Sequence, residues 1–238
     1  MEEYRLKHEK DNTPYQIEKD RKKMLIARNE LRMVGKYNIP LIKKQDINLE
    51  SLDVIGYTKT KLGDTENKNK MVHFAHHDWK FETVWREPEK AIEKLGQYYA
   101  LCSPDFSIYW DMPLALQINN VFRNRWCGAY WQSLGLKVIP TIAWGDEKTW
   151  EFCFDGVEEG STVFVITYFV RHPDRFLAGY NKMLEKIKPE TVIVYGEKIA
   201  GMKGNITTIN PYDMKEGMEK LGAEEYTKRF FDGTIYPK

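Results

Sequence analysis

The stretch Ala100-Leu-Cys-Ser-Pro-Asp-Phe-Ser-Ile-Tyr-Trp-Asp-Met-Pro-Leu-Ala115 joins an apolar strand pattern, a polar turn and the start of a helix. The turn carries Asp105, Trp110 and Asp111, and Asp111 is placed to cap the helix that Pro113 opens. In parallel α/β sheets, ligands bind at the carboxyl ends of the strands. This turn is therefore the first candidate site in the chain.

Strand and helix patterns alternate after residue 70. Continuous runs of Val, Ile and Phe predict strands, and amphipathic stretches predict helices. Such apolar runs are typical of a parallel sheet with helices on both faces. We expect an α/β fold with a mostly parallel sheet of five or six strands, either an open doubly wound sheet or an incomplete β/α barrel. The expected strands are residues 71–75, 98–103, 137–144, 162–168, 191–195 and, as a sixth, 206–209; the expected helices are 88–95, 112–134 and 174–187.

The predicted helix 112–134 carries its own packing and termination signals. Trp131 lies at helical spacing from Cys127 and Leu134, which predicts that its indole is part of the core. Gly135 follows the last helical position and is expected to form the C-terminal cap.

The first 70 residues differ in character from the rest. Residues up to about Gly35 are highly charged with a ragged apolar stripe, which predicts an appended N-terminal helix. Residues 63–69 form a polar loop pattern. We therefore expect a helical and irregular extension over residues 1–70 and an α/β domain over residues 71–238.

Composition excludes several broad classes. The chain has 238 residues with 36 basic and 35 acidic side chains, a net charge of +1, so no global field attracts nucleic acid or an anionic membrane. Any polyanion site must be local. No apolar run is long enough to cross a bilayer and the charged start is not a signal peptide, so we expect a cytoplasmic protein. The three widely spaced cysteines indicate reduced packing residues.

Polar residues follow the predicted strands where they end. If the strands are parallel, their carboxyl ends gather polar side chains from four strands: His76, His77, Asp78, Asp105, Asp146, Glu147 and Glu197. Carboxylates with imidazoles can hold a divalent metal or supply an acid/base pair, and each carboxylate has a helix cap as its alternative role. The predicted catalytic residues are Asp105, Asp111 and Asp146, and the candidate ligands of a divalent metal cofactor are Asp105, His77 and Asp78.

Other residues point to a bound ligand. Trp110 and Trp144 can stack on a base or a sugar, and core packing is their alternative. Arg125 can clamp an anion or instead pair with the buried acid Asp105. We therefore predict Trp110, Arg125, Trp144 and Glu197 as ligand-binding residues.

Several catalytic motifs are absent from the sequence. It contains no Gly-x-x-x-x-Gly-Lys-Ser/Thr loop, no Gly-x-Gly-x-x-Gly after a strand, no Gly-x-Ser-x-Gly elbow and no His-Glu-x-x-His. These absences argue against nucleotide hydrolysis on a phosphate loop, Rossmann-type dinucleotide binding and serine hydrolase chemistry.

Seven short motifs between residues 72 and 156 suggest a family. They are Val72-His-Phe, Phe81-Glu-Thr-Val-Trp85, Ser103-Pro-Asp-Phe-Ser107, Asp111-Met-Pro113, Arg125-Trp-Cys-Gly-Ala-Tyr-Trp131, Val138-Ile-Pro140 and Phe152-Cys-Phe-Asp-Gly156. Over residues 72–196 the chain resembles the domain-of-unknown-function family 4417 of Firmicutes, their prophages and mobile elements. The resemblance implies a bacterial or mobile-element setting and supplies neither an activity nor catalytic residues.

Two functions from different classes fit these patterns. The first is a hydrolase or transferase acting on a phosphorylated or nucleotide-like ligand at the strand carboxyl ends. The second is a non-catalytic phage or mobile-element protein that binds a host or phage macromolecule, such as a protein partner, through its aromatic surface and N-terminal helix. The enzyme requires a pocket with facing carboxylates, whereas the binding protein requires an exposed apolar patch.

Overall fold

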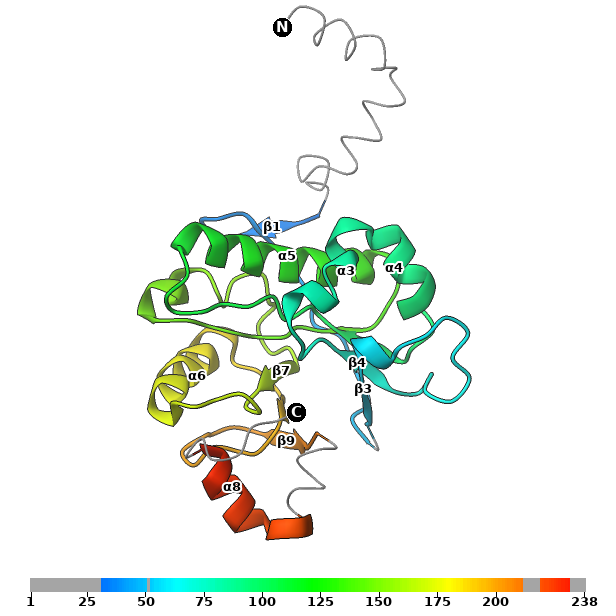
Figure 1. Cartoon of the computed structure of the whole chain (residues 1–238). Coiled ribbons are helices and arrows are strands. Elements are labelled where there is room, and N and C mark those ends of the chain that lie inside the picture. The colour runs from blue at the N-terminus through cyan, green and yellow to red at the C-terminus, as the bar shows by residue number, and fades with distance from the viewer. Residues whose placement is uncertain (1–30, 51, 212–218, 232–238) are drawn as a thin grey trace, which may run out of the picture.

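The computed structural model describes residues 31–50, 52–211 and 219–231 (Figure 1). The N-terminal helix expected before Gly35 falls almost wholly on residues 1–30 and lies outside the described residues. The strands are β1 (Met33–Val34), β2 (Ile39–Pro40), β3 (Val54–Gly56), β4 (Met71–His73), β5 (Ala100–Cys102), β6 (Val138–Ile139), β7 (Val163–Ile166), β8 (Val192–Tyr195) and β9 (Ile206–Ile209). The α-helices are α3 (Thr83–Arg86), α4 (Pro88–Leu95), α5 (Leu114–Ser133), α6 (Pro173–Ile187) and α8 (Ala223–Phe231), and the 3-10 helices are η2 (Tyr57–Lys59), η3 (Asp78–Lys80) and η4 (Glu147–Glu151).

Parallel strands form the two main sheets. The first has the order β3-β4-β5-β6 and the second the order β7-β8-β9, with every neighbouring pair parallel. This confirms the α/β class and the parallel pairing. The strand order follows the chain without the reversal that marks a doubly wound sheet.

The single sheet of five or six strands is not formed within the described residues. The strand expected over 137–144 is regular only at Val138 and Ile139, because Pro140 has no N–H group with which to continue the ladder. An isolated bridge between Thr141 and Phe164 links the two sheets, with the Phe164 amide donating to the Pro140 carbonyl over 2.9 Å.

Strand β7 shows how the second sheet is covered. Val163 and Val165 belong to the same buried cluster as Tyr180 and Met183 of α6. Phe164 lies between Val163 and Val165 in the sequence. It belongs to the other core cluster, which contains residues of β4, β5 and β6. Since successive strand residues point to opposite faces, α6 covers one face and the opposite face is turned towards the first sheet. Figure 1 shows α6 beside β7, away from α3, α4 and α5.

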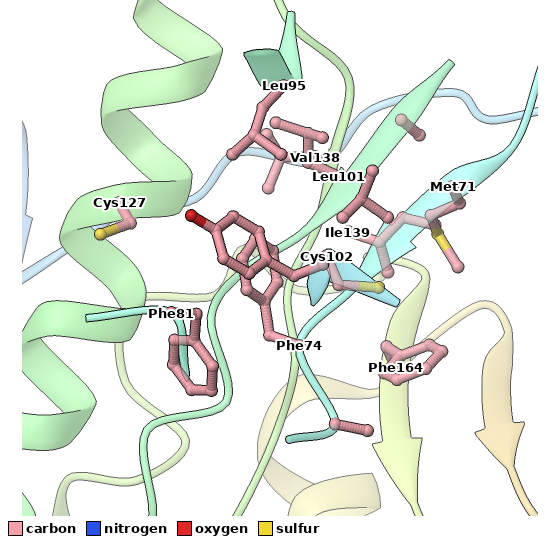
Figure 2. Close-up of a cluster of buried hydrophobic side chains, with 14 of the residues drawn as sticks. Met71, Phe74, Phe81, Leu95, Leu101, Cys102, Cys127, Val138, Ile139 and Phe164 are labelled. Carbon is pink, nitrogen blue, oxygen red and sulfur yellow. The ribbon is translucent and has the colours of Figure 1, made fainter. Parts of the chain in front are cut away.

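Both sheets contribute to one interior. The rings of Phe164 and Tyr195 lie 6.4 and 4.4 Å from the ring of His73 on β4, measured between centroids. Figure 2 shows Phe164 beside Met71, Cys102 and other core side chains of the first sheet. The carboxyl ends of strands from both sheets therefore converge on the same space.

Helix α5 matches its expected range and C-terminal cap. The Gly135 amide donates to the Gln132 carbonyl over 2.9 Å, the Leu136 amide donates to the Trp131 carbonyl over 3.1 Å, and Gly135 has φ +83°. This pair of hydrogen bonds is a Schellman motif, which a glycine accommodates without a Cβ penalty. The indole of Trp131 is fully buried and stacks on the Phe74 ring with centroids 5.7 Å apart, which confirms its predicted core position.

The predicted N-terminal cap of α5 is wrong. Pro113 occupies the N-cap position without a side-chain hydrogen bond, and Asp111 is exposed. Asp111 lies in the turn that the Met112 amide closes onto the Tyr109 carbonyl, two residues before the cap. From there its carboxylate does not cap the first amides of the helix.

The segment before residue 70, which was expected to form an irregular extension, supplies a strand to the first sheet. Val54, Ile55 and Gly56 of β3 pair in parallel register with Met71, Val72 and His73 of β4. The polar residues on both sides of this short strand gave no sign of its place in the sheet.

The three cysteines are part of the packed core. Cys102, Cys127 and Cys153 are buried free thiols, and Figure 2 shows the first two within the core cluster. Within the described ranges, no helix combines the length and the apolar character that a membrane span requires.

We expect Trp131→Ala to lower the free energy of unfolding by roughly 3 to 5 kcal/mol, because it removes a fully buried indole and leaves a cavity. The matched control is Trp79→Ala, since Trp79 is 75% exposed and its loss is expected to change stability by less than about 0.5 kcal/mol. Urea unfolding of both variants measures the difference. Equal small losses would show that Trp131 is not part of the packed core.

Candidate functional site

A cavity of about 870 Å³ opens at the carboxyl ends of six parallel strands. Every strand from β3 to β8 contributes a wall residue at its end or just beyond it, and the cavity therefore spans both sheets. This is the edge at which parallel α/β proteins bind their ligands. Representative wall residues, in strand order, are Gly56, His73, Asp105, Trp144, Ile166 and Tyr195.

Asp105 is the acidic side chain of the cavity wall. The pKa of its carboxyl group is raised to about 7, first by burial and then by the nearby Asp78 carboxylate, while Arg125 opposes the shift. Among the described residues, no hydrogen bond or ion pair reaches this carboxyl group. An acid with a pKa near 7 exchanges a proton readily at neutral pH, as a general acid or base must.

Asp78 positions the segment that follows Asp105. Its carboxylate accepts hydrogen bonds from the Ser107 hydroxyl over 2.7 Å and from the Ser107 amide over 3.1 Å. Asp78 is thus occupied outside the cavity wall, while its negative charge disfavours a second charge on Asp105.

The predicted metal ligands do not come together. His77 lines the cavity, but Asp78 does not. Across the described ranges of the chain, no three His, Cys, Asp or Glu side chains lie close enough to hold a metal ion. Asp105, His77 and Asp78 therefore form no such cluster in this structure.

His73 and His76 supply polar groups to the wall. Burial lowers the pKa of His73 to about 3, with His76 and Lys59 adding to the effect. The Ala75 amide donates to His73 Nδ1 over 3.2 Å, which places the proton of the neutral ring on Nε2. The pKa of His76 is also lowered, by burial and then by Lys80 and Lys59. Both imidazoles are therefore suited to hydrogen bonding as neutral groups at neutral pH.

His73, Lys59 and Lys80 were not among the site residues predicted from the sequence. One signal was available for the histidine, because it interrupts the apolar strand Met71-Val-His-Phe-Ala75, where a polar side chain needs a partner or a function. Lys59 and Lys80 lie in polar segments that give no comparable signal. Neither lysine forms an ion pair within the described residues, so the cavity has two unneutralised cations at its wall.

Trp144 forms part of the aromatic wall. Its ring lies 5.0 Å from Phe176 and 6.1 Å from Phe154, between centroids. Gly179 of α6 lies against the indole, and a Cβ atom at this position would meet Trp144 at 2.2 Å. The glycine therefore allows the indole to pack against α6 where it lines the cavity.

Arg125 is directed away from the cavity. Its guanidinium donates to the carbonyl oxygens of Asp155, Thr141 and Cys153 and to Asn124 Oδ1 over 2.6 to 3.0 Å. Its hydrogen bonds are directed to neither Asp105 nor the cavity, so the structure places Arg125 in a structural network.

The other predicted site residues lie outside the cavity. Asp146 caps η4 by accepting from the Lys148 amide over 3.2 Å, and Glu197 accepts from Asn210 Nδ2 over 2.7 Å. Trp110 is 62% exposed, and Asp111 is also exposed. The cavity thus brings together Asp105, His77 and Trp144 from the sequence-based set, whereas Asp78, Trp110, Asp111, Arg125, Asp146 and Glu197 do not line it.

The comparisons with known proteins match the part of the chain that contains both parallel sheets. The family described as a domain of unknown function (DUF4417) matches residues 31–213, which include all the strands of both parallel sheets. The chain belongs to this family. No solved structure matches the chain.

Two phage proteins of the same name are similar to it. The Gene 1 protein of Mycobacterium phage L5 is 41% identical over 130 residues, covering 53% of this chain and 57% of the relative. The Gene 1 protein of Mycobacterium phage D29 is 42% identical over 129 residues, covering 52% of this chain and 48% of the relative. The chain therefore spans about half the length of the curated relatives it matches, and the family has phage-encoded relatives.

We expect Asp105→Asn to stabilise the protein at about pH 8. An acid whose pKa is raised on folding contributes most stability below its ordinary pKa of 3.8, and this contribution is lost as the pH rises through about 7. The amide stays neutral, so the variant is expected to gain roughly 4 kcal/mol over the parent at about pH 8 and to lose most of this advantage by about pH 4.

Urea unfolding at both pH values measures this effect. Asp146→Asn is the matched control, since asparagine also caps helices. Its effect on the free energy of unfolding should differ little between the two pH values. Destabilisation of Asp105→Asn at pH 8 would show instead that its carboxylate is ionised and stabilised by a cation such as Arg125.

Proposed function

We propose that the cavity binds a phosphorylated, nucleotide-like ligand and that the protein acts on it as a hydrolase or transferase. The observation that carries the proposal is Asp105, an acid in the cavity wall whose pKa is raised to about 7. The phage relatives support a setting in the cytoplasm of a bacterium that carries a phage or mobile element.

The wall has groups for each part of such a ligand. Trp144, Phe176 and Tyr168 present aromatic surface to the cavity, which suits a base. Lys59 and Lys80 provide positive charge for phosphate oxygens. A cavity with a largely apolar wall and a few convergent polar groups is the usual form of a small-molecule site.

Asp105 has the properties of the proton-transferring group. In its ionised form it takes a proton from the hydroxyl group or water that attacks the phosphorus atom. The bond between phosphorus and the leaving oxygen then breaks, and the lysines offset the charge on the phosphoryl oxygens. The Nε2–H of neutral His73 is available as a hydrogen-bond donor in the same cavity.

A second candidate is macromolecule binding without catalysis. Trp79 and Trp110 are 75% and 62% exposed, which favours a contact surface beside the cavity. In that case the carboxyl group of Asp105 would not be needed for any turnover.

Turnover of nucleoside mono-, di- and triphosphates, measured as released phosphate and nucleoside product, tests the proposal. We expect Asp105→Asn to lower kcat by about 10²- to 10⁴-fold, because it removes general acid/base catalysis and preserves the shape of the side chain. The pH profile of the parent should show an inflection near the Asp105 pKa, about 7.

Asp146→Asn serves as the matched control, since Asp146 caps η4 outside the cavity wall and its loss should leave turnover within about twofold. Calorimetric titration of the same nucleotides separates binding from chemistry. Turnover by Asp105→Asn at the parental rate, or no binding of any nucleotide by the parent, would contradict the proposal.

A further inference from the structure

We propose that the substrate of this cavity is a nucleotide within a single-stranded polynucleotide, held by an aromatic and cationic rim around the cavity mouth. The rim consists of four exposed aromatic residues, Trp79, Tyr109, Trp110 and Phe169, and the cations Lys59, Lys80 and Arg175. The inference rests on the proposed function and specifies its substrate class.

The aromatic part of the rim is concentrated at one place in the fold. Trp79, Tyr109, Trp110 and Phe169 are 75%, 57%, 62% and 51% exposed. Among the described residues, every other large hydrophobic side chain with comparable exposure is a leucine. Tyr109 and Phe169 line the cavity, while Trp79 and Trp110 adjoin the lining residues Lys80 and Tyr109 in sequence. Exposed aromatic rings therefore gather where the strands from both sheets end.

Two of the three cations of the rim, Lys80 and Arg175, lie against its rings. Lys80 Nζ lies 5.5 Å from the Trp79 ring centroid, and the Arg175 guanidinium carbon lies 4.4 Å from that of Trp110. In the described part of the chain, neither cation forms an ion pair with a carboxylate. Burial is the main cause of the lowered pKa of His76, and Lys80 and Lys59 lower it further, as positive charge near the cavity does. The rim thus provides the local polyanion site that the net charge of +1 leaves open.

This arrangement fits unpaired nucleic acid better than the alternatives. Proteins bind single strands by stacking bases on aromatic side chains and by placing cations along the phosphate backbone. Duplex bases have their faces covered, and a single nucleotide cannot occupy the separate rings of the rim and the cavity together. The core of a protein–protein interface is depleted in lysine, whereas Lys80 lies against the Trp79 ring of the rim. One nucleotide turned out of the strand can reach Asp105 in the cavity.

Fluorescence anisotropy of labelled 12-nucleotide oligo-dT and oligo-U with the full chain tests the inference. We expect the double variant Trp79→Ala/Trp110→Ala to weaken binding by about 30-fold or more, since two stacking positions are lost. Lys80→Glu is expected to weaken binding about tenfold and to reduce the dependence on salt concentration. The two oligonucleotides show whether the strand is DNA or RNA.

The matched control is Lys137→Glu. Lys137 lies 4.4 Å from the Tyr99 ring centroid, and both residues immediately precede strands, at the amino edge of the first sheet. This substitution makes the same change in charge at a cation–π pair on the opposite edge, so binding should stay within about twofold of the parent. Unchanged melting temperatures of all variants exclude loss of the fold as the cause.

The outcomes separate this inference from the proposed function. The inference about the rim is overturned if the parent binds oligonucleotides no more tightly than mononucleotides, or if the Trp79→Ala/Trp110→Ala variant still binds them as the parent does. The proposed turnover of mononucleotides can stand in either case. Rim-dependent binding of oligonucleotides without any Asp105-dependent turnover supports the rim and overturns the enzymatic proposal. Binding of duplex DNA as tight as that of oligo-dT also overturns the inference, because stacking on open base faces would not then be the source of affinity.

Discussion

The cavity depends on the hydrogen bonds that the buried guanidinium group of Arg125 donates to backbone carbonyl groups. From α5 it donates to the Thr141 carbonyl over 2.9 Å, to the Cys153 carbonyl over 2.9 Å and to the Asp155 carbonyl over 3.0 Å. Burial lowers the pKa of Arg125 to about 10, so the group stays charged at neutral pH. Without it, the Cys153 and Asp155 carbonyl groups would lose the guanidinium donor, at a typical cost of about 1 to 3 kcal/mol for a buried group left unsatisfied, and the Thr141 carbonyl would keep only the Asn124 amide. One cation thus fixes two segments against α5.

The same network sets the relative positions of the strand ends. The Ser103 hydroxyl donates to Asn124 Oδ1 over 2.7 Å and accepts from the Thr141 amide over 2.8 Å. The Thr141 hydroxyl donates in turn to the Ser103 carbonyl over 2.6 Å. The ends of β5 and β6 are therefore held together; Asp105 follows Ser103 by two residues, and Trp144 follows Thr141 by three. Their joint presence in the cavity wall is a consequence of this buried polar contact.

Local patterns predicted the elements well, and long-range pairing was harder to predict. Helix α4 has the bounds that its sequence indicated, and the strand carboxyl ends do carry the cavity with Asp105 and Trp144. The hydrogen-bond partners of Arg125 could not be predicted. The sequence does not reveal whether a guanidinium group donates to a carboxylate or to backbone carbonyl groups far away in the chain. His73 was missed for a related reason, since its role depends on rings from β7 and β8 that lie far away in the sequence.

Two aspartates show why Asp105 is the functional candidate. Asp64 is buried, and although burial raises its pKa, hydrogen bonds from the Asn67 side chain, the Glu66 amide and the Tyr98 hydroxyl lower it to about 2. That carboxylate is fully occupied in holding a loop. Asp105 has no such donors among the described residues, and its pKa of about 7 makes its ionised form costly to the fold. A side chain that costs stability at neutral pH is retained where chemistry or binding needs it, because a neutral residue of similar size would fold better.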